Sequence, residues 1–176
     1  MKRALTLALT LLFLTLPLGA LCDDSFEIGA LAPVELPAQQ EALIADLYCG
    51  PTQGFFRHGD LTVDTGAPFV YFGQYDCWAM VASGTLEDMG PIGWVESAAF
   101  LAPDNPQLAF DDALTVMVED DTFLTDEPLA ASPAHICDVA RGTQVILLAQ
   151  YEGWGYVQSE IDGTPVRAFL PLSAVL

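Results

Sequence analysis

The chain has 176 residues and carries 24 acidic residues against five basic ones, which gives a net charge of −19. A surface of this charge repels nucleic acid, anionic lipid and anionic wall polymers, so it excludes nucleic-acid binding and suits a soluble protein outside the cytoplasm. The length allows one domain or two small ones.

The first 20 residues have the pattern of a secretory signal peptide. Lys2 and Arg3 precede an apolar run that ends at Leu18, and the small residue Ala20 offers a cleavage site. The run is short for a membrane span, and no later segment is apolar for long enough to cross a bilayer. We therefore expect residues 1–20 to be removed and the protein to be secreted or held in the periplasm or cell envelope.

The start of the mature chain raises the question of a lipid anchor at Cys22. A lipid-anchored cysteine usually follows a small residue, and Leu21 is not small, so ordinary cleavage near Ala20 is favoured over an anchor. After cleavage the basic residues are three arginines and no lysine, and against the 24 acidic residues they give a net charge of −21. A cationic peptide or protein fits this charge better than an anionic polymer does.

The first half of the mature chain predicts short strands separated by turn residues. Residues 21–40 are a leader segment with two prolines, no clear period and space for one strand-like patch. The elements that we expect after the leader are a strand within Glu41–Tyr48, strands at Leu61–Asp64, Phe69–Phe72, Trp78–Val81 and Ile92–Val95, and a short closing element at Ser97–Leu101.

The stretch Gly66–Val81 recurs in altered form as Gly142–Val157. A strand, a tight polar turn and a second strand account for both copies, so a β-hairpin is predicted twice. In the first hairpin Trp78 and Met80 should lie on one face of the strand, with Ala79 on the other. An offset of 76 aligns five identical pairs: Gly66 with Gly142, Gln74 with Gln150, Tyr75 with Tyr151, Trp78 with Trp154, and Val81 with Val157.

The second half follows a linker, residues 103–113, that is rich in proline and aspartate. Short strands without long helical patterns predict an all-β fold, a small barrel or sandwich in each of two units, 41–102 and 114–176. The strands that we expect in the second unit are Leu114–Val118, Phe123-Leu124, Ile136–Val139, Val145–Leu148, Trp154–Val157 and Val166–Leu170.

Two cysteines, Cys49 and Cys77, lie in the first copy and have no cysteine counterpart in the second. The same offset places Thr125 and Gly153 opposite them, so both are present together and absent together, as a covalent pair predicts. A Cys49–Cys77 disulfide would add about 3 kcal/mol of stability by restricting the unfolded chain. Cys137 then pairs with Cys22 or fills the core as a small apolar side chain.

Four motifs follow one another in the first copy: a Tyr-x-x-Pro opening at Tyr48, the stretch from Gly66 to Val70, a Cys-Trp-x-x-Val strand at Cys77 and a late Gly-Trp-Val at Gly93. In this order and spacing they resemble the bacterial SH3-like (SH3b) domain, and the resemblance extends over two tandem copies. It implies two small SH3-like β-barrels. The family accompanies wall hydrolases or binds peptidoglycan peptides, proteins or other envelope ligands, and it is not itself enzymatic.

The resemblance also implies a groove bordered by aromatic side chains, which provide large contact areas in binding sites. In the alternative interpretation the tryptophans only cover the core. The second copy lacks the late Gly-Trp, so we expect the first copy to be the binder. The candidate ligand-binding residues are Tyr48, Phe56, Tyr75, Trp78, Trp94, Tyr151 and Trp154.

Catalytic chemistry has little support in the sequence. The candidate thiol–imidazole pairs are Cys49 with His58 and Cys137 with His135, and neither lies in a nucleophile pattern. The acidic runs lack the spacing of a calcium loop, so we expect no metal, no cofactor and no enzyme. The sequence predicts an exported, non-catalytic binding module for a cell-wall peptide, a protein or another envelope or extracellular ligand. The alternative is a structural protein–protein adaptor in the envelope without a small ligand.

Overall fold

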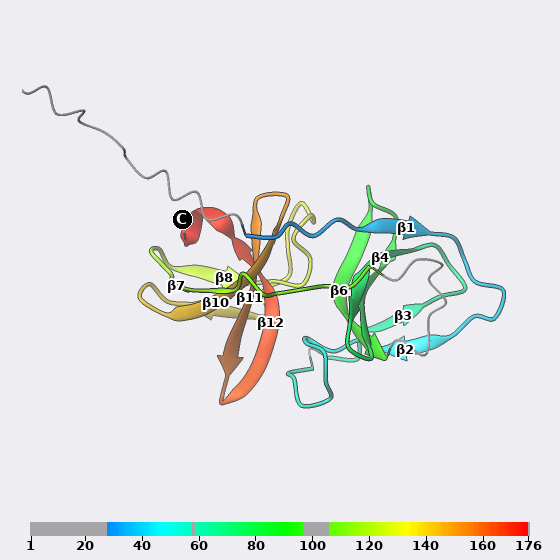
Figure 1. The fold of residues 1–176 in the computed structure, drawn as a ribbon, viewed down its shortest axis with the longest axis horizontal. Helices are drawn as coiled ribbons and strands as arrows, with labels where there is room; N and C mark the ends of the chain where they lie inside the picture. Colours follow the sequence, from blue (N-terminus) through cyan, green and yellow to red (C-terminus); the bar gives the residue numbers. More distant parts are fainter. Residues whose placement is uncertain (1–27, 58, 97–105, 176) are drawn as a thin grey trace, which may run out of the picture.

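The structure is a computed structural model that describes residues 28–57, 59–96 and 106–175, and in these residues it is all-β (Figure 1). Twelve strands and a short 3₁₀ turn make up its regular structure, which confirms the predicted fold class at this level. The expected signal peptide, Cys22, His58 and the element at 97–101 lie outside the described residues. None of the described helical segments is long and apolar enough to cross a membrane.

The first half contains a four-stranded antiparallel sheet and a two-stranded ribbon. The strand order in the sheet is β1-β4-β5-β6, and β2 pairs with β3 in the ribbon. The bounds are β1 (Val34–Leu36), β2 (Ile44–Asp46), β3 (Thr62–Asp64), β4 (Phe69–Tyr75), β5 (Trp78–Gly84) and β6 (Met89–Glu96).

The second half repeats this topology strand for strand. Its sheet has the order β7-β10-β11-β12, its ribbon pairs β8 with β9, and a 3₁₀ turn at Leu172–Ala174 follows. The bounds are β7 (Leu114–Met117), β8 (Thr122–Leu124), β9 (Cys137–Val139), β10 (Gln144–Tyr151), β11 (Trp154–Ile161) and β12 (Thr164–Pro171). The repeat seen in the sequence is therefore also a repeat of the fold.

The two hairpins of the repeat match in detail. Each turns through two residues, and the first of them has a positive φ, 55° at Asp76 and 48° at Glu152. Each also shifts its register at an equivalent place, between Tyr71 and Gly73 in the first copy and 76 residues later in the second. Such a bulge bends the strand and increases its twist. The hairpin prediction is thus confirmed in both copies.

The leader contributes one strand, whose bounds and partner could not be assigned from the sequence. Strand β1 lies within residues 21–40 and pairs with β4, with Val34 opposite Tyr71 and Leu36 opposite Phe69. Its partner is more than 30 residues away, so no local turn signal marks the pairing. Conversely, only Ile44–Asp46 of the expected strand at Glu41–Tyr48 is extended in a ladder.

Both faces of the central strands of the first sheet are buried. Phe69 and Tyr71 of β4 belong to the core of the first half, whereas Val70 and Phe72 face a cluster that also contains residues of the second half. Strand β5 divides in the same way, with Ala79 in the first-half core, as the alternation of side chains along a strand requires. The partners from the second half in this shared cluster are Leu148, Ala149, Tyr151, Tyr156 and Phe169. We call it the junction.

One buried hydrogen bond lies in the junction. The indole Nε1–H of Trp94 donates to the hydroxyl of Tyr156 at 2.6 Å, and each of the two residues is only 1% exposed. Backbone hydrogen bonds also join the edge strand of each sheet to a connecting segment of the other half. The N–H of Ile92 donates to the carbonyl of Asp126 at 2.8 Å, and the N–H of Arg167 donates to the carbonyl of Cys49.

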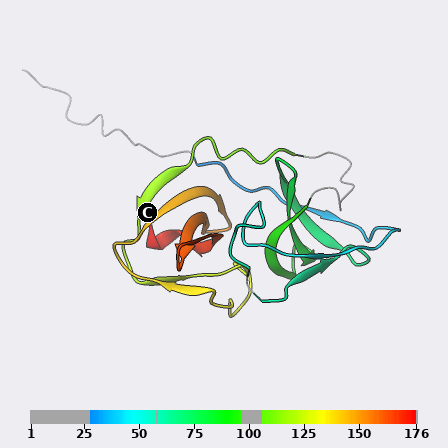
Figure 2. The same ribbon diagram turned by 90° about the horizontal axis from the view of Figure 1, so that it is seen from below.

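Each half also binds the segment that leads into the other half. The N–H of Leu31, ahead of β1, donates to the carbonyl of Gln150 at 2.9 Å, and the N–H of Leu108, ahead of β7, donates to the carbonyl of Gln74 at 2.7 Å. Gln74 and Gln150 are equivalent in the repeat, so the exchange is reciprocal. The blue segment ahead of β1 can be followed from the second half to the first in both views (Figure 1 and Figure 2).

We predict that either Trp94→Phe or Tyr156→Phe destabilises the protein by about 1–3 kcal/mol, because each leaves a buried polar group without its partner. The double variant should cost less than the sum of the two. Chemical denaturation of the purified protein measures this. Tyr75→Phe serves as the control, since Tyr75 is 38% exposed and its change should stay within about 0.5 kcal/mol. Additive single effects would contradict a coupled pair.

Candidate ligand-binding site

Three of the seven predicted ligand-binding residues are buried in the junction. Trp78, Trp94 and Tyr151 are 6%, 1% and 8% exposed. The ring of Trp78 meets Tyr48 edge-on at 5.5 Å between centroids, and Tyr151 meets Phe72 in the same way at 5.5 Å. These side chains therefore contact the chain itself, and their part in ligand binding stays a prediction.

Tyr48, Phe56 and Tyr75 are more accessible than these three and lie beside the junction. Phe56 packs against the core of the second half, and its N–H donates to the carbonyl of Pro165 at 2.8 Å. Tyr75 contacts Trp94 edge-on, with 6.4 Å between the centroids. The seven predicted residues thus all lie in or beside the contact between the halves, since Trp154, which is only partly buried, also packs against the junction.

Arg167 lies among aromatic rings at the edge of this contact. Its Cζ is 5.4 Å from the ring centroid of Phe55, 5.5 Å from that of Tyr75 and 5.2 Å from that of Phe110. Its Nε–H donates to Oε1 of Gln158 at 3.0 Å, while its buried Nη1 finds no hydrogen-bond partner among the described residues. The guanidinium is therefore held chiefly by ring faces, an interaction that no local sequence pattern announces.

The hydroxyl of Tyr156 stays protonated to a higher pH than an ordinary tyrosine does. Burial raises its pKa strongly, and the nearby charge of Arg167 and the hydrogen bond from Trp94 oppose this only in part. Burial likewise raises the pKa of Tyr71 and of Tyr151, where the charge of Glu152 adds to the effect. Burial therefore favours the neutral phenol at Tyr151 and Tyr156 in the junction and at Tyr71 in the first-half core.

The seventh predicted residue, Trp154, belongs to a partly exposed cluster on the second half. The ring of Phe123 stacks on His135 with centroids 3.9 Å apart and planes 10° apart, and Trp154 meets Phe123 edge-on at 6.1 Å. His135 Nδ1 lies 3.9 Å from Oδ1 of Asp138, which is opposite Phe123 in the β8–β9 ribbon. We call Phe123, His135 and Trp154 the aromatic surface.

A hollow of about 530 Å³ borders the aromatic surface. It brings one aromatic ring together with two carboxylates, those of Asp121 and Asp138. Ring faces and carboxylates both attract cations, so the arrangement suits a ligand with a positively charged group. Sequence reasoning missed Phe123, although its place before a Thr-Asp turn and its aromatic type were visible. The residues that line the hollow are Asp121, Thr122, Phe123, Asp138, Val139 and Ala140.

The structure does not contain the predicted Cys49–Cys77 disulfide. No two cysteines of the described part of the chain lie at disulfide distance. Cys77 is exposed at the β4–β5 turn, whereas Cys49 is buried in the core cluster of the second half. In addition, the sequence alignment that paired Cys49 with Thr125 is wrong by one residue at this position. Tyr48 forms an isolated β-bridge with Trp94, and Thr125 forms the equivalent bridge with Phe169. Thr125 is therefore the structural counterpart of Tyr48, and Asp126 is that of Cys49.

The remaining candidates for chemistry are weak. Burial raises the pKa of the Cys137 thiol, and the charge of Asp138 raises it further, which disfavours the reactive thiolate. Within the described ranges, no three histidine, cysteine, aspartate or glutamate side chains form a group that could hold a metal ion.

No protein-family model matches the chain, and neither a curated protein nor a solved structure matches it. The resemblance to the SH3b family therefore stays a prediction that is carried by the sequence motifs.

We predict that the protein loses stability as the pH rises above about 10, the ordinary pKa of tyrosine. Above this pH the unfolded state releases a proton that the folded state still holds on Tyr156, so ionisation favours unfolding. Denaturation between pH 8 and 11 measures the loss. Tyr156→Phe should show a shallower alkaline decline than the parent, and equal declines would contradict the assignment.

We also predict that Cys77 reacts quickly with an alkylating reagent in the folded protein and that Cys49 reacts only on unfolding, because Cys77 is exposed and Cys49 is buried. Mass spectrometry of proteolytic fragments assigns the modified site. A fragment that joins Cys49 to Cys77 in unreduced, secreted protein would restore the disulfide prediction instead.

Proposed function

We propose that this protein is exported after removal of residues 1–20 and acts as a non-catalytic binding module made of two SH3-like barrels. A cell-wall peptide, a protein or another envelope or extracellular ligand is the proposed partner. The order of the SH3b-type motifs and the repeat of a four-stranded sheet with a two-stranded ribbon support this proposal.

The observation that carries the proposal is the aromatic surface of Phe123, His135 and Trp154 beside its hollow. Trp78, the counterpart of Trp154 in the first copy, is 6% exposed and contacts Tyr48, whereas Trp154 is partly exposed. This difference favours the second copy as the one that binds the ligand and the first as its structural support. The sequence alone favours the first copy as the binder.

The chemistry of the surface favours a peptide with a cationic side chain. An ammonium or guanidinium group gains from the ring faces of Phe123 and Trp154 and from the carboxylate of Asp138. The overall negative charge of the protein adds a long-range attraction for such a ligand. Both effects weaken with rising salt, although the close contacts weaken less.

A specific observation also favours the alternative of a protein–protein adaptor. Trp78 and Trp94 are buried in the junction, so the first copy offers neither tryptophan to a small ligand in this arrangement. At the same time Leu43 and Ile44 are 41% and 68% exposed on the first half. Neighbouring exposed aliphatic side chains suit contact with another protein.

We predict that Trp154→Ala weakens binding to purified peptidoglycan by about tenfold or more, as loss of a central aromatic contact typically does. Cosedimentation and fluorescence titration with soluble wall peptides measure this. Ile44→Ala is the control, because it removes a 68% exposed apolar side chain on the first half, outside the aromatic surface.

Binding that is equal in Trp154→Ala, Ile44→Ala and the parent would contradict the assignment of the site. Absence of binding to any wall fraction, together with a protein partner captured by cross-linking, would replace the binding module by the adaptor.

A further inference from the structure

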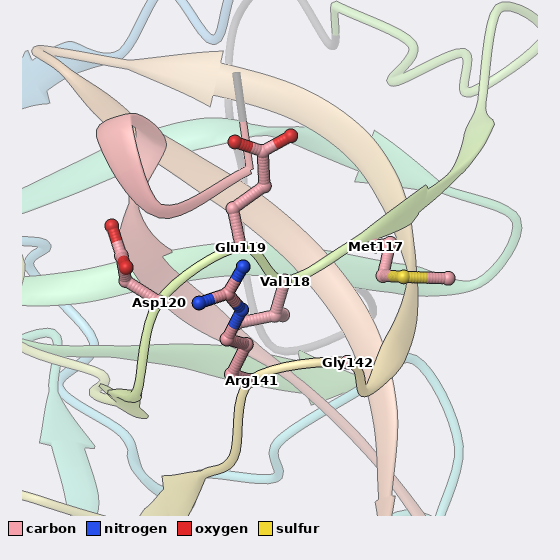
Figure 3. A pocket seen from close by; sticks show the side chains of 6 residues that line it. All are labelled: Met117, Val118, Glu119, Asp120, Arg141 and Gly142. Atoms are coloured by element: carbon pink, nitrogen blue, oxygen red, sulfur yellow. The ribbon is translucent and has the colours of Figure 1, made fainter.

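A second pocket, of about 350 Å³, lies where the β7–β8 and β9–β10 connections meet (Figure 3). It shares no lining residue with the hollow at the aromatic surface, although the two linings are adjacent in the sequence at residues 120–121 and 140–141. We call it the turn pocket. Its lining residues are Met117, Val118, Glu119, Asp120, Arg141 and Gly142.

Hydrogen bonds fix the walls of the turn pocket. The N–H of Val118 donates to the carbonyl of Thr143 at 2.9 Å, and the N–H of Gly142 donates to the carbonyl of Val118 at 2.8 Å. The N–H of Arg141 donates to Oδ1 of Asp121 at 2.8 Å. Gly142 has a φ of 86°, which a residue with a side chain rarely adopts. The backbone that carries the pocket is therefore fixed before any ligand arrives, which lowers the cost of binding.

The guanidinium of Arg141 differs from those of the other two arginines in the described residues. Arg57 pairs with Asp46 at 3.0 Å, and Arg167 lies among aromatic rings. Arg141 has no carboxylate within 4.0 Å in the described part of the chain. In Figure 3 its guanidinium points toward the side of the pocket that carries Glu119 and Asp120.

An apolar shelf adjoins these charges. Met117 is 55% exposed at the end of β7, and Ile146 is 38% exposed on β10. Met117 is opposite Gln144, so Ile146 lies diagonally across on the same face, within reach of a long side chain. Positive charge, negative charge and apolar surface thus occur together at one small pocket.

We propose that the turn pocket binds a zwitterion, namely an amino acid or short peptide with a free ammonium and a free carboxylate group. Arg141 binds the carboxylate, Glu119 and Asp120 bind the ammonium, and an apolar ligand side chain rests on Met117. A ligand with net negative charge is repelled by the acidic protein, and a purely cationic one gains nothing from Arg141. Groups of both signs therefore select a ligand that carries both.

Leucyl-alanine is a suitable probe, because it carries both end charges and an apolar side chain. The full mature protein is titrated with leucyl-alanine, with its N-acetyl form, with its C-terminal amide and with the doubly blocked form, by calorimetry and by amide chemical shifts. We expect each single block to weaken binding about tenfold or more, as loss of a charge-assisted contact does. Shift changes should centre on residues 117–120 and 141–142.

Variants assign the two charges separately. Arg141→Gln should weaken leucyl-alanine binding and remove its advantage over the amide, while Glu119→Gln should reduce its advantage over the N-acetyl form. Arg141→Lys, which keeps the charge, should retain part of the affinity, and its thermal midpoint checks that the fold is intact. Arg57→Gln is the control, because it removes an arginine that is already paired on the other half.

Equal affinity for the free and blocked dipeptides would overturn the proposal, as would undetectable binding at millimolar concentration or unchanged binding in Arg141→Gln. Trp154→Ala should leave leucyl-alanine binding intact. This result separates the turn pocket from the proposed wall-peptide function, which can fail while the pocket still binds.

Discussion

The hydrogen bond from Trp94 to Tyr156 is the polar contact on which the arrangement of the two halves depends. Both groups are buried, so separating the halves would leave an indole N–H and a phenol without partners or would require water to replace them. The apolar residues around the bond reinforce this constraint. Val70 and Phe72 would become exposed on a lone first half, because the other face of their strand already forms its own core. Units of about 60 residues are near the lower limit for independent cores, and the junction supplies each with a second one.

Much of the fold could be predicted from local patterns, whereas the contact between the halves could not. The repeat, the hairpins and the opposite facing of Trp78 and Ala79 follow from spacing alone. The pairing of β1 with β4 was missed because the two strands are distant in the sequence, and a ladder between remote segments has no local signature. One signal of the junction was nevertheless present. The run Phe69–Phe72 is apolar at every position, which is typical of a strand buried on both faces.

The candidate site shows the limit of reasoning by residue type. Trp78 and Trp154 are identical in the aligned repeat, yet one is buried and the other is partly exposed, because their surroundings differ. Aromatic residues gather at ligand grooves and at contacts within a protein for the same physical reason, the large area that they remove from water. The charge on Arg141 could be counted in the sequence, but that no carboxylate of the described residues pairs with it depends on three-dimensional packing.

The reciprocal contacts between the halves have a consequence for their order in the chain. Two identical subunits around a twofold axis make every contact across it twice, but joined copies are free of that rule. Met80 is opposite Trp94 in the first sheet, and Tyr156 is opposite Phe169 in the second. Exchanging the roles of the halves would bring a thioether against a phenyl ring, which cannot form the bond. A protein assembled from two first copies or from two second copies would lack the Trp94–Tyr156 hydrogen bond altogether. The two copies can therefore no longer replace one another.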